Sequence, residues 1–228
     1  MGGNRKHSRY FVLNKPAGCI TATRDFASRP TVYDHVPTHF PCLPHVGRLD
    51  YQTEGLLLFT DDGRLAQALL NPRFSGSAAA DSVAPIEKIY RVKVRDRLAT
   101  DDRRIPLLGK PLHYRSGYTT RAARVRFVEH RTRATWLEVA ITEGRNRQVR
   151  RLCERSGLAV LKLRRVALGP LTLGELPLRW CRPLCEDEVE ALYAAALPAD
   201  QRPDFAPIDD SEEARSSRPI RDERDSGS

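Results

Sequence analysis

Gly47-Arg48-Leu49-Asp50 leads, through residues 51–55, into the apolar run Leu56-Leu57-Leu58-Phe59. A short apolar run is typical of a buried strand, here over residues 56–60. A carboxylate on a glycine-bounded loop just before such a strand is placed to project from a sheet end into a cleft, where Asp50 would be a nucleophile or a base. The spacing by itself favours a simpler interpretation, a turn aspartate that accepts backbone hydrogen bonds.

The residues on either side of this run predict short elements. Before it we expect a strand at 10–14, a turn at 15–18 and a returning strand at 19–23. After it, an Asp-Asp-Gly turn precedes a helix at 64–70, which Pro72 ends.

The second half of the chain opens on a period-2 pattern. Between Glu87 and Arg95, Tyr90, Val92 and Val94 alternate with charged residues, as in a half-buried strand. Further expected elements are strands at 122–128 and 135–142, a helix from Asn146 as N-cap to Ser156 with Gly157 at its end, and a helix at 186–197. Short strands with a few interspersed helices predict an α+β fold.

The charge of the chain is unevenly distributed. Its 38 Lys and Arg against 29 Asp and Glu give a net charge of +9. Residues 198–228 hold 9 acidic and 5 basic side chains, a net of −4, so residues 1–197 carry +13. We expect a basic arm at 1–9, a body at 10–197 in two halves with their boundary near 73–86, and a disordered acidic tail at 198–228.

Several protein classes are excluded or disfavoured. No apolar run approaches the roughly 20 residues of a membrane span, and residues 1–10 lack a signal-peptide pattern, so we expect a cytoplasmic protein with no membrane contact. The order of a Ser–His–Asp triad, a Walker loop and a G-x-G-x-x-G motif are also missing.

Cysteine and histidine give no firm site. The five cysteines are scattered and odd in number, which indicates reduced thiols. His35, His39, Cys42 and His45 could supply zinc ligands, but their spacing fits no common zinc finger and prolines interrupt it. We therefore expect loop histidines and no metal.

The densest basic stretch is Arg145–Arg165, with seven Arg and one Lys against the single acid Glu154. A helix start with exposed N–H groups and arginine side chains makes a good anion site. Basic helix faces are often merely solvated, but few acidic side chains on this helix balance the charge. Together with the net charge, the stretch indicates a polyanionic partner.

Several segments, taken together and in order over residues 10–195, resemble the pseudouridine synthases of the RsuA/RluB/RluE/RluF branch, which modify ribosomal RNA. Each motif is weak alone, whereas the ordered set is highly specific. The segments are Leu13-Asn14-Lys15-Pro16-Ala17-Gly18, residues 47–63, Glu87-Lys88-Ile89-Tyr90-Arg91-Val92, residues 143–152, residues 165–171 and Arg182-Pro183-Leu184. Only nine residues precede the first strand, so an S4-type domain is not expected, as in RluE-type members.

The resemblance implies the catalytic fold of that family: a central mixed, mostly antiparallel sheet with flanking helices and a cleft that holds the active site. It also implies roles for particular residues. Asp50 matches the essential aspartate, Tyr90 the tyrosine that packs on the target base, and Arg145 the basic residue that pairs with the aspartate. Leu49 and Val149 would line the pocket. The residues expected to contact RNA are Lys15, Arg48, Arg147, Gln148, Arg150 and Arg151.

The implied function is an isomerase that converts a uridine of ribosomal RNA, free or in a pre-ribosomal particle, to pseudouridine. The reaction adds and removes nothing, so no cofactor is expected, and a monomer is the default. An alternative is a non-catalytic RNA-binding or ribosome-assembly factor that uses the same basic surface. The joint presence of Asp50, Tyr90 and Arg145 favours the enzyme over this factor and over a zinc-dependent one.

Overall fold

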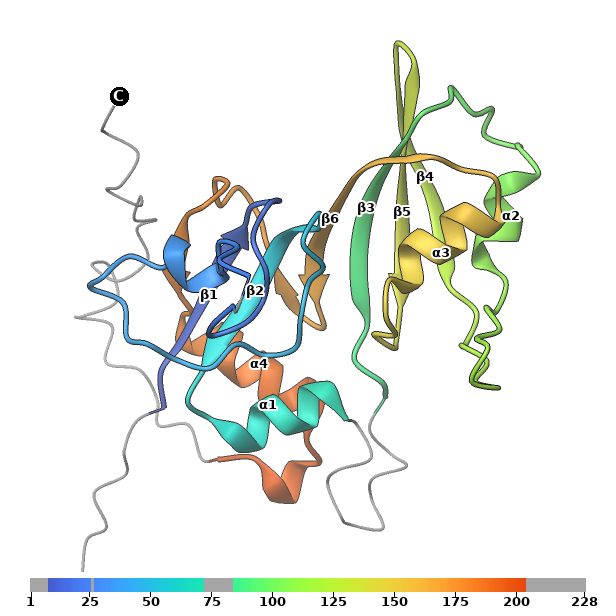
Figure 1. The fold of residues 1–228 in the computed structure, drawn as a ribbon. Coiled ribbons are helices and arrows are strands. Elements are labelled where there is room, and N and C mark those ends of the chain that lie inside the picture. Colours follow the sequence, from blue (N-terminus) through green and yellow to red (C-terminus); the bar gives the residue numbers. More distant parts are fainter. Residues whose placement is uncertain (1–7, 26, 72–83, 204–228) are drawn as a thin grey trace, which may run out of the picture.

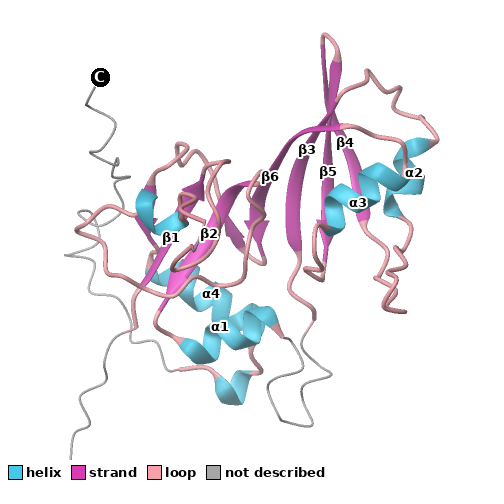
Figure 2. Ribbon diagram, viewed as in Figure 1, coloured by secondary structure: helices cyan, strands magenta, loops and turns pink. Residues whose placement is uncertain are grey.

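The computed structural model describes residues 8–25, 27–71 and 84–203. Its main feature is one long sheet that runs across the molecule with helices packed on it (Figures 1 and 2). The strands lie in the order β4-β5-β3-β6-β2-β1-β8, and β7 pairs with β6. The strands are β1 (Tyr10–Lys15), β2 (Glu54–Thr60), β3 (Lys88–Val94), β4 (Arg124–Arg131), β5 (Ala134–Ile141), β6 (Val160–Leu168), β7 (Leu171–Thr172) and β8 (Cys181–Pro183). The helices are α1 (Gly63–Leu70), α2 (Arg104–Gly109), α3 (Gln148–Arg155) and α4 (Glu186–Ala196), with single turns η1 (Val32–His35) and η4 (Ala199–Gln201).

Strand β6 joins the two halves of the sheet. It pairs with β3 in antiparallel fashion on one side and with β2 in parallel on the other, where Gly55 lies opposite Arg165. In Figure 1, β6 passes from the half formed by β3, β4 and β5 to the half formed by β1 and β2. Every other strand pair of the described sheet is antiparallel. The expected α+β class with a mixed, mostly antiparallel sheet is confirmed.

The apolar run at the end of the opening motif is buried on both faces of the sheet. Leu57 and Phe59 belong to a core that contains η1, α2 and α3, whereas Leu56 and Leu58 belong to a second core with α1 and α4. Because successive strand residues point to opposite faces, a strand covered on both faces must be apolar throughout. This explains why residues 56–59 do not alternate with polar ones.

Strand β3 is covered on one face only. Tyr90, Val92 and Val94 are buried in the core with α2 and α3, while Arg91 on the opposite face is exposed. The alternation predicted from the sequence is confirmed, and it sets which side chains of β3 can reach a pocket.

The helices start and end close to the expected positions, with one correction. Asp62 caps α1 by accepting a hydrogen bond from the Leu65 N–H at 2.9 Å. The residue that caps α3 is Arg147, in a left-handed conformation with φ of 50°, and the expectation of Asn146 was wrong by one residue. Gly157 ends this helix with φ of +70°, as expected.

The returning strand expected at 19–23 does not form. Both edges of β1 are occupied, by β2 and by β8, so the chain has no free edge to pair with. Ile20 instead bridges to Thr31, and the Thr21 hydroxyl exchanges hydrogen bonds with the backbone of Leu49. The segment therefore supports the loop that carries Asp50.

Strand β6, which is central to the sheet, was not expected from the sequence. Its pocket-facing residues are Leu163, Arg165 and Leu168, and the buried arginine and a register shift between Arg165 and Ala167 break the apolar alternation that would indicate a strand. Strands β7 and β8 and helix α2 are short and were not expected either.

The expected segment boundaries are only partly within the described residues. Most of the loop at 73–86, most of the arm at 1–9 and residues 204–228 lie outside them. The described fold extends past the expected end at 197, because Arg202 donates hydrogen bonds to the carbonyls of Leu197 and Ala194 at the end of α4. Within the described part, no helix is both long and apolar enough to cross a bilayer.

Candidate active site

The loop that carries Asp50 is fixed from beneath by Lys15. The Lys15 side chain is 0% exposed, and its ammonium donates hydrogen bonds to the carbonyls of Pro16, Asp50 and Thr53 at 2.9, 3.2 and 2.9 Å. Burial lowers the pKa of Lys15 from its ordinary value. The expectation that Lys15 contacts RNA is therefore corrected: its charge is used inside the protein to hold the Asp50 loop.

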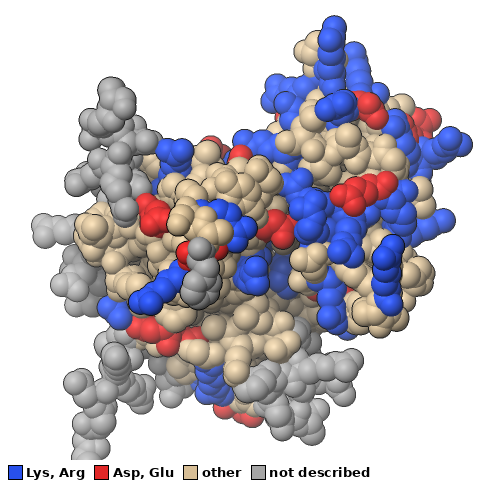
Figure 3. All heavy atoms as spheres, in the orientation of Figure 1, with Lys and Arg blue, Asp and Glu red and all other residues tan. Residues whose placement is uncertain are grey.

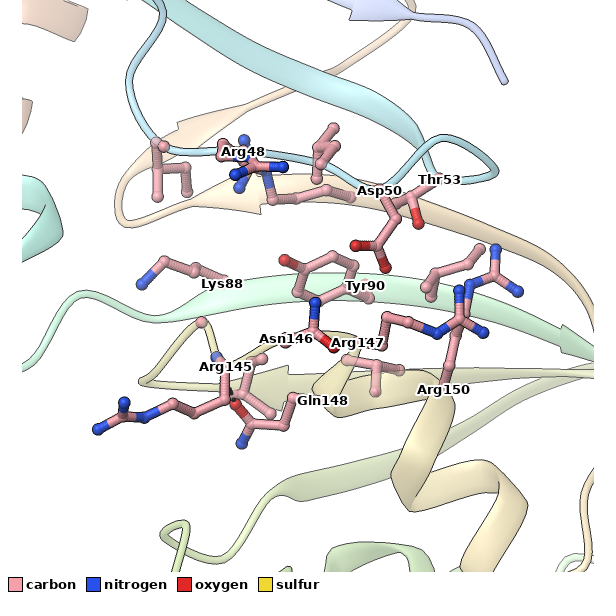
Figure 4. Close-up of a pocket in the computed structure, with 18 of the residues that line it drawn as sticks. Arg48, Asp50, Thr53, Lys88, Tyr90, Arg145, Asn146, Arg147, Gln148 and Arg150 are labelled. Carbon is pink, nitrogen blue, oxygen red and sulfur yellow. Dashed lines mark hydrogen bonds between the residues drawn. The ribbon is translucent and has the colours of Figure 1, made fainter. Parts of the chain in front are cut away.

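Tyr90 lies on β3 and is 8% exposed, so only a small part of its side chain is accessible. Its neighbour across the sheet is Arg165 of β6, and Lys88 lies two residues away on the same face of β3. Figure 4 shows the Asp50 carboxylate directed toward the side of the pocket where the Tyr90 ring lies. The tertiary structure thus brings Asp50 and Tyr90 together at one pocket.

A pocket of about 440 Å³ lies over these residues, at the junction of the two halves of the sheet. Its wall comes from the Asp50 loop, from β3 and β6, and from the segment that starts α3 (Figure 4). The volume falls within the range of small-molecule and cofactor sites. The polar and charged lining residues are Arg48, Asp50, Thr53, Lys88, Tyr90, Arg145, Asn146, Arg147, Gln148, Arg150 and Arg165.

Arg145 does not pair with Asp50 in this structure. Its guanidinium lies over the ring of Tyr118, with 3.7 Å from the Cζ atom to the ring centroid, and Figure 4 shows the side chain directed away from Asp50. The cation–π contact explains this orientation. The expected pairing is thus corrected for Arg145, and the positive charge near Asp50 comes from another residue.

Arg150, in the first turn of α3, supplies that charge. Its guanidinium donates a hydrogen bond to the carbonyl of Gln52 at 2.9 Å, within the Asp50 loop. Burial and the charge of Arg147 lower the pKa of Arg150, while the charge of Asp50 acts in the opposite direction. Arg150 therefore ties α3 to the loop that carries Asp50 and places a positive charge near its carboxylate.

Gln148 also differs from its expected role. It is 3% exposed, and its side-chain oxygen accepts a hydrogen bond from the Arg145 N–H at 3.2 Å. Its Nε2 atom is buried without a hydrogen-bond partner. Gln148 shapes the turn before α3 and lines the pocket, so it is not placed to contact an RNA backbone at the surface. Leu49 and Val149, expected as pocket residues, both line it.

The remaining expected RNA contacts are at the surface. Arg48, Arg147 and Arg151 are exposed, and Arg151 lies over the Tyr114 ring with 4.8 Å to its centroid. Figure 3 shows Lys and Arg gathered over the half that contains α2 and α3 and along the hollow between the halves. The side of the molecule on which the pocket opens is therefore strongly basic.

Two charged pocket residues, Lys88 and Arg165, were not expected from the sequence. Lys88 and Tyr90 are two residues apart on β3, so the period-2 pattern already indicated that their side chains lie on the same face of the strand. No pattern in the sequence indicated Arg165, because the strand that carries it, β6, was not expected.

The histidine and cysteine cluster does not form a metal centre. His45 hydrogen-bonds the Gly47 carbonyl through Nδ1 at 2.9 Å, and the His39 ring packs against Phe40. In the part of the chain that the structure describes, no three His, Cys, Asp or Glu residues are grouped to hold a metal ion.

The chain is similar in sequence and in fold to known proteins. Residues 9–155 match the family model described as RNA pseudouridylate synthase. The chain is 34% identical over 193 residues to the ribosomal large subunit pseudouridine synthase B of Bacillus subtilis, with 84% of this chain and 74% of that protein covered. It is 32% identical over 192 residues to an uncharacterized RNA pseudouridine synthase of Aquifex aeolicus, with 83% and 72% covered.

A crystal structure of a pseudouridylate synthase has a TM-score of 0.66 and 30% identity to this chain, with 82% of this chain and 74% of that chain covered. Some relatives are much longer: the synthase B of Xanthomonas campestris is 33% identical, and the match spans 37% of its length. These similarities define an RNA-modifying enzyme of the isomerase class. The chain belongs to the RNA pseudouridylate synthase family.

Proposed function

We propose that this chain converts a uridine of large-subunit ribosomal RNA to pseudouridine, with Asp50 acting on the ribose. The observation that supports the proposal most is the position of Asp50, at a pocket beside the Tyr90 ring and on a loop held by Lys15. Relatives that match over most of this chain are named as synthases of the large ribosomal subunit, which supports the choice of RNA.

The chemistry needs few groups. The bond between N1 of uracil and C1′ of ribose breaks, a bond between C5 and C1′ forms, C5 loses a proton and N1 gains one. Asp50 would either bond to C1′ or remove the proton on C2′, and both roles require an ionised carboxylate that faces the sugar. Arg150 places a positive charge near that carboxylate, and the Tyr90 ring offers a flat surface on which the detached base can stay.

The target base must first leave its helix stack. Unstacking costs a few kcal/mol, which contacts elsewhere on the RNA must offset. The exposed Arg48, Arg147 and Arg151 at and near the pocket are suited to phosphate oxygens, and arginines on tyrosine rings are suited to unpaired bases. A target in a loop or bulge of the RNA fits this surface better than one in a regular duplex.

The decisive experiment is Asp50→Asn, which keeps the size of the side chain and removes its charge. The substrate is large-subunit ribosomal RNA transcribed in vitro with tritium at C5 of uridine, because the reaction releases the hydrogen on C5. We expect single-turnover tritium release to fall by at least about 10³-fold, as for the loss of other essential catalytic side chains.

Asp61→Asn is the matched control, since Asp61 lies on the turn after β2 and forms a surface ion pair with Arg9 at 3.1 Å. It should release tritium at the wild-type rate. No release by the wild-type protein from large-subunit ribosomal RNA would refute the proposed substrate, and no release from ribosomal RNA of either subunit would favour the non-catalytic RNA-binding alternative. Full activity of Asp50→Asn would refute the catalytic role of the aspartate.

A further inference from the structure

The pocket contains a second charged site, on the side of Tyr90 away from Asp50. Lys88 is 8% exposed and lines the pocket, and Figure 4 shows it on the opposite side of the Tyr90 ring from Asp50. Its side chain passes beside Gly144, at 4.0 Å from the position that a Cβ there would take. Among the described residues, none forms a hydrogen bond or an ion pair with its ammonium.

Arg165 is the second cation of this site. It is 3% exposed and lines the same pocket from β6. Its Nε atom donates a hydrogen bond to the carbonyl of Leu56 at 2.8 Å, but its Nη2 atom is buried without a hydrogen-bond partner. A residue that lines the pocket therefore holds part of its guanidinium buried with unused hydrogen-bonding capacity.

The two cations act on each other. Burial and the charge of Arg165 together lower the pKa of Lys88 to about 8, and Glu143 opposes them only in part. The Glu143 carboxylate already accepts hydrogen bonds from the Tyr118 hydroxyl and the Arg121 N–H, at 2.7 and 2.6 Å. Burying two cations with little opposing charge nearby lowers the stability of the folded protein, and a bound anion offsets that loss.

We propose that Lys88 and Arg165 form an anion site that binds a negatively charged oxygen of the substrate nucleotide while Asp50 acts on its ribose. The inference rests on the proposed function. Residues two apart on a strand are about 7 Å apart, which is comparable with the length of a pyrimidine with its ring substituents. A base that stacks on Tyr90 with its C1′ at Asp50 therefore extends toward Lys88.

Two oxygens of the nucleotide have the required charge. When the bond between N1 and C1′ breaks with its electron pair on N1, the negative charge spreads over the ring to O2 and O4, and it is consumed when C5 forms the new bond to C1′. The other source is a non-bridging oxygen of a phosphate next to the target nucleotide. The first exists only during the reaction, whereas the second is present in the bound substrate.

The experiment compares Lys88→Met, which removes the charge but keeps the length, with Lys88→Arg, which keeps the charge. Lys93→Met is the matched control, because Lys93 lies on the same strand and on its opposite face. For each protein we measure the dissociation constant of unmodified large-subunit ribosomal RNA over a salt series and the single-turnover release of tritium from C5. Circular dichroism and thermal unfolding establish that each variant is folded.

If the site binds the uracil anion, Lys88→Met lowers the single-turnover rate by about 100-fold and leaves the dissociation constant unchanged. If it binds a phosphate, Lys88→Met weakens RNA binding and reduces the salt slope by about one charge. Lys88→Arg should recover most of either loss.

Three results would overturn the inference: a Lys88→Met protein within twofold of wild type in both measurements, a Lys88→Arg protein as impaired as Lys88→Met, or an equal loss in Lys93→Met. In each of these cases the wild-type protein still releases tritium and Asp50→Asn is still impaired. Failure of the anion site is therefore distinguishable from failure of the proposed function.

Discussion

The position of Asp50 depends on a residue whose role is opposite to the one its type predicts. A lysine just before a Pro-Ala-Gly turn is expected at the surface, yet Lys15 is buried and uses its three donors on carbonyls of its own protein. Leaving several buried carbonyls without a donor costs about 1–3 kcal/mol each, so the loop and the ammonium are strongly coupled. The buried ammonium of Lys15 is thus one support of the Asp50 loop.

Arginine side chains around the pocket also have separate roles. We predict that Arg150→Ala lowers single-turnover tritium release at least about tenfold, because hydrogen bonds to charged groups contribute about 1.5–3 kcal/mol and Arg150 links α3 to the Asp50 loop. Arg145→Ala should instead lower the free energy of unfolding by about 0.5–1 kcal/mol through the loss of its contact with Tyr118.

The rate is measured with protein in excess over RNA, and the free energy of unfolding is measured in urea. A larger loss of rate in Arg145→Ala than in Arg150→Ala would show that Arg145 swings to Asp50 once RNA binds.

At the level of elements, the parallel contact between β2 and β6 positions the whole pocket. The Asp50 loop leads into β2, Tyr90 is on β3, and only β6 connects the two strands. At this contact Gly55 has φ of +107°, and a Cβ at this position would collide with the backbone carbonyl of Arg165. Glycine is therefore required here both by the backbone conformation and by the close approach of β6.

Gly55→Ala should lower the free energy of unfolding by more than about 3 kcal/mol, or prevent folding, since backbone cannot move aside as a flexible side chain can. Gly63→Ala is the control, because Gly63 lies in the first turn of α1 with open space around it, and alanine there should be neutral or stabilise by about 0.5–1 kcal/mol. Equal urea midpoints for the two variants would contradict this account of the β2–β6 contact.

For the whole molecule, charge distribution decides how RNA is attracted. The net charge of +9 for the chain includes an acidic terminal segment, and residues 204–228 alone hold 8 acidic and 4 basic side chains. The described fold ends near Arg202, which closes the end of α4. Removal of residues 204–228 therefore raises the net charge without touching the described contacts.

We predict that deletion of residues 204–228 leaves the single-turnover rate within about twofold of wild type and tightens RNA binding at low salt more than at high salt, because the removed charge is screened by salt. Dissociation constants over a salt series test this prediction. Weaker binding, or a rate lowered tenfold, would show that the segment contributes directly to substrate binding.

The sequence by itself determined the family, the position of Asp50, which we propose as the catalytic carboxylate, and most elements near it. These features are local: a Gly-bounded loop before an apolar run, a period-2 strand with Tyr90, and a helix that starts after a Gly-Arg turn. Such patterns depend on neighbours in the chain, so they can be predicted without knowing which strands pair.

Only the tertiary structure decided which charges meet. Lys15 is buried, and Arg150 rather than Arg145 forms a hydrogen bond with the Asp50 loop. Lys88 and Arg165 line the same pocket, because β6 brings distant segments together. A basic residue has the same appearance in sequence whether it is solvated, stacked on a ring or buried against carbonyls. The long-range pairing of strands fixes the difference, and with it the polarity of the pocket.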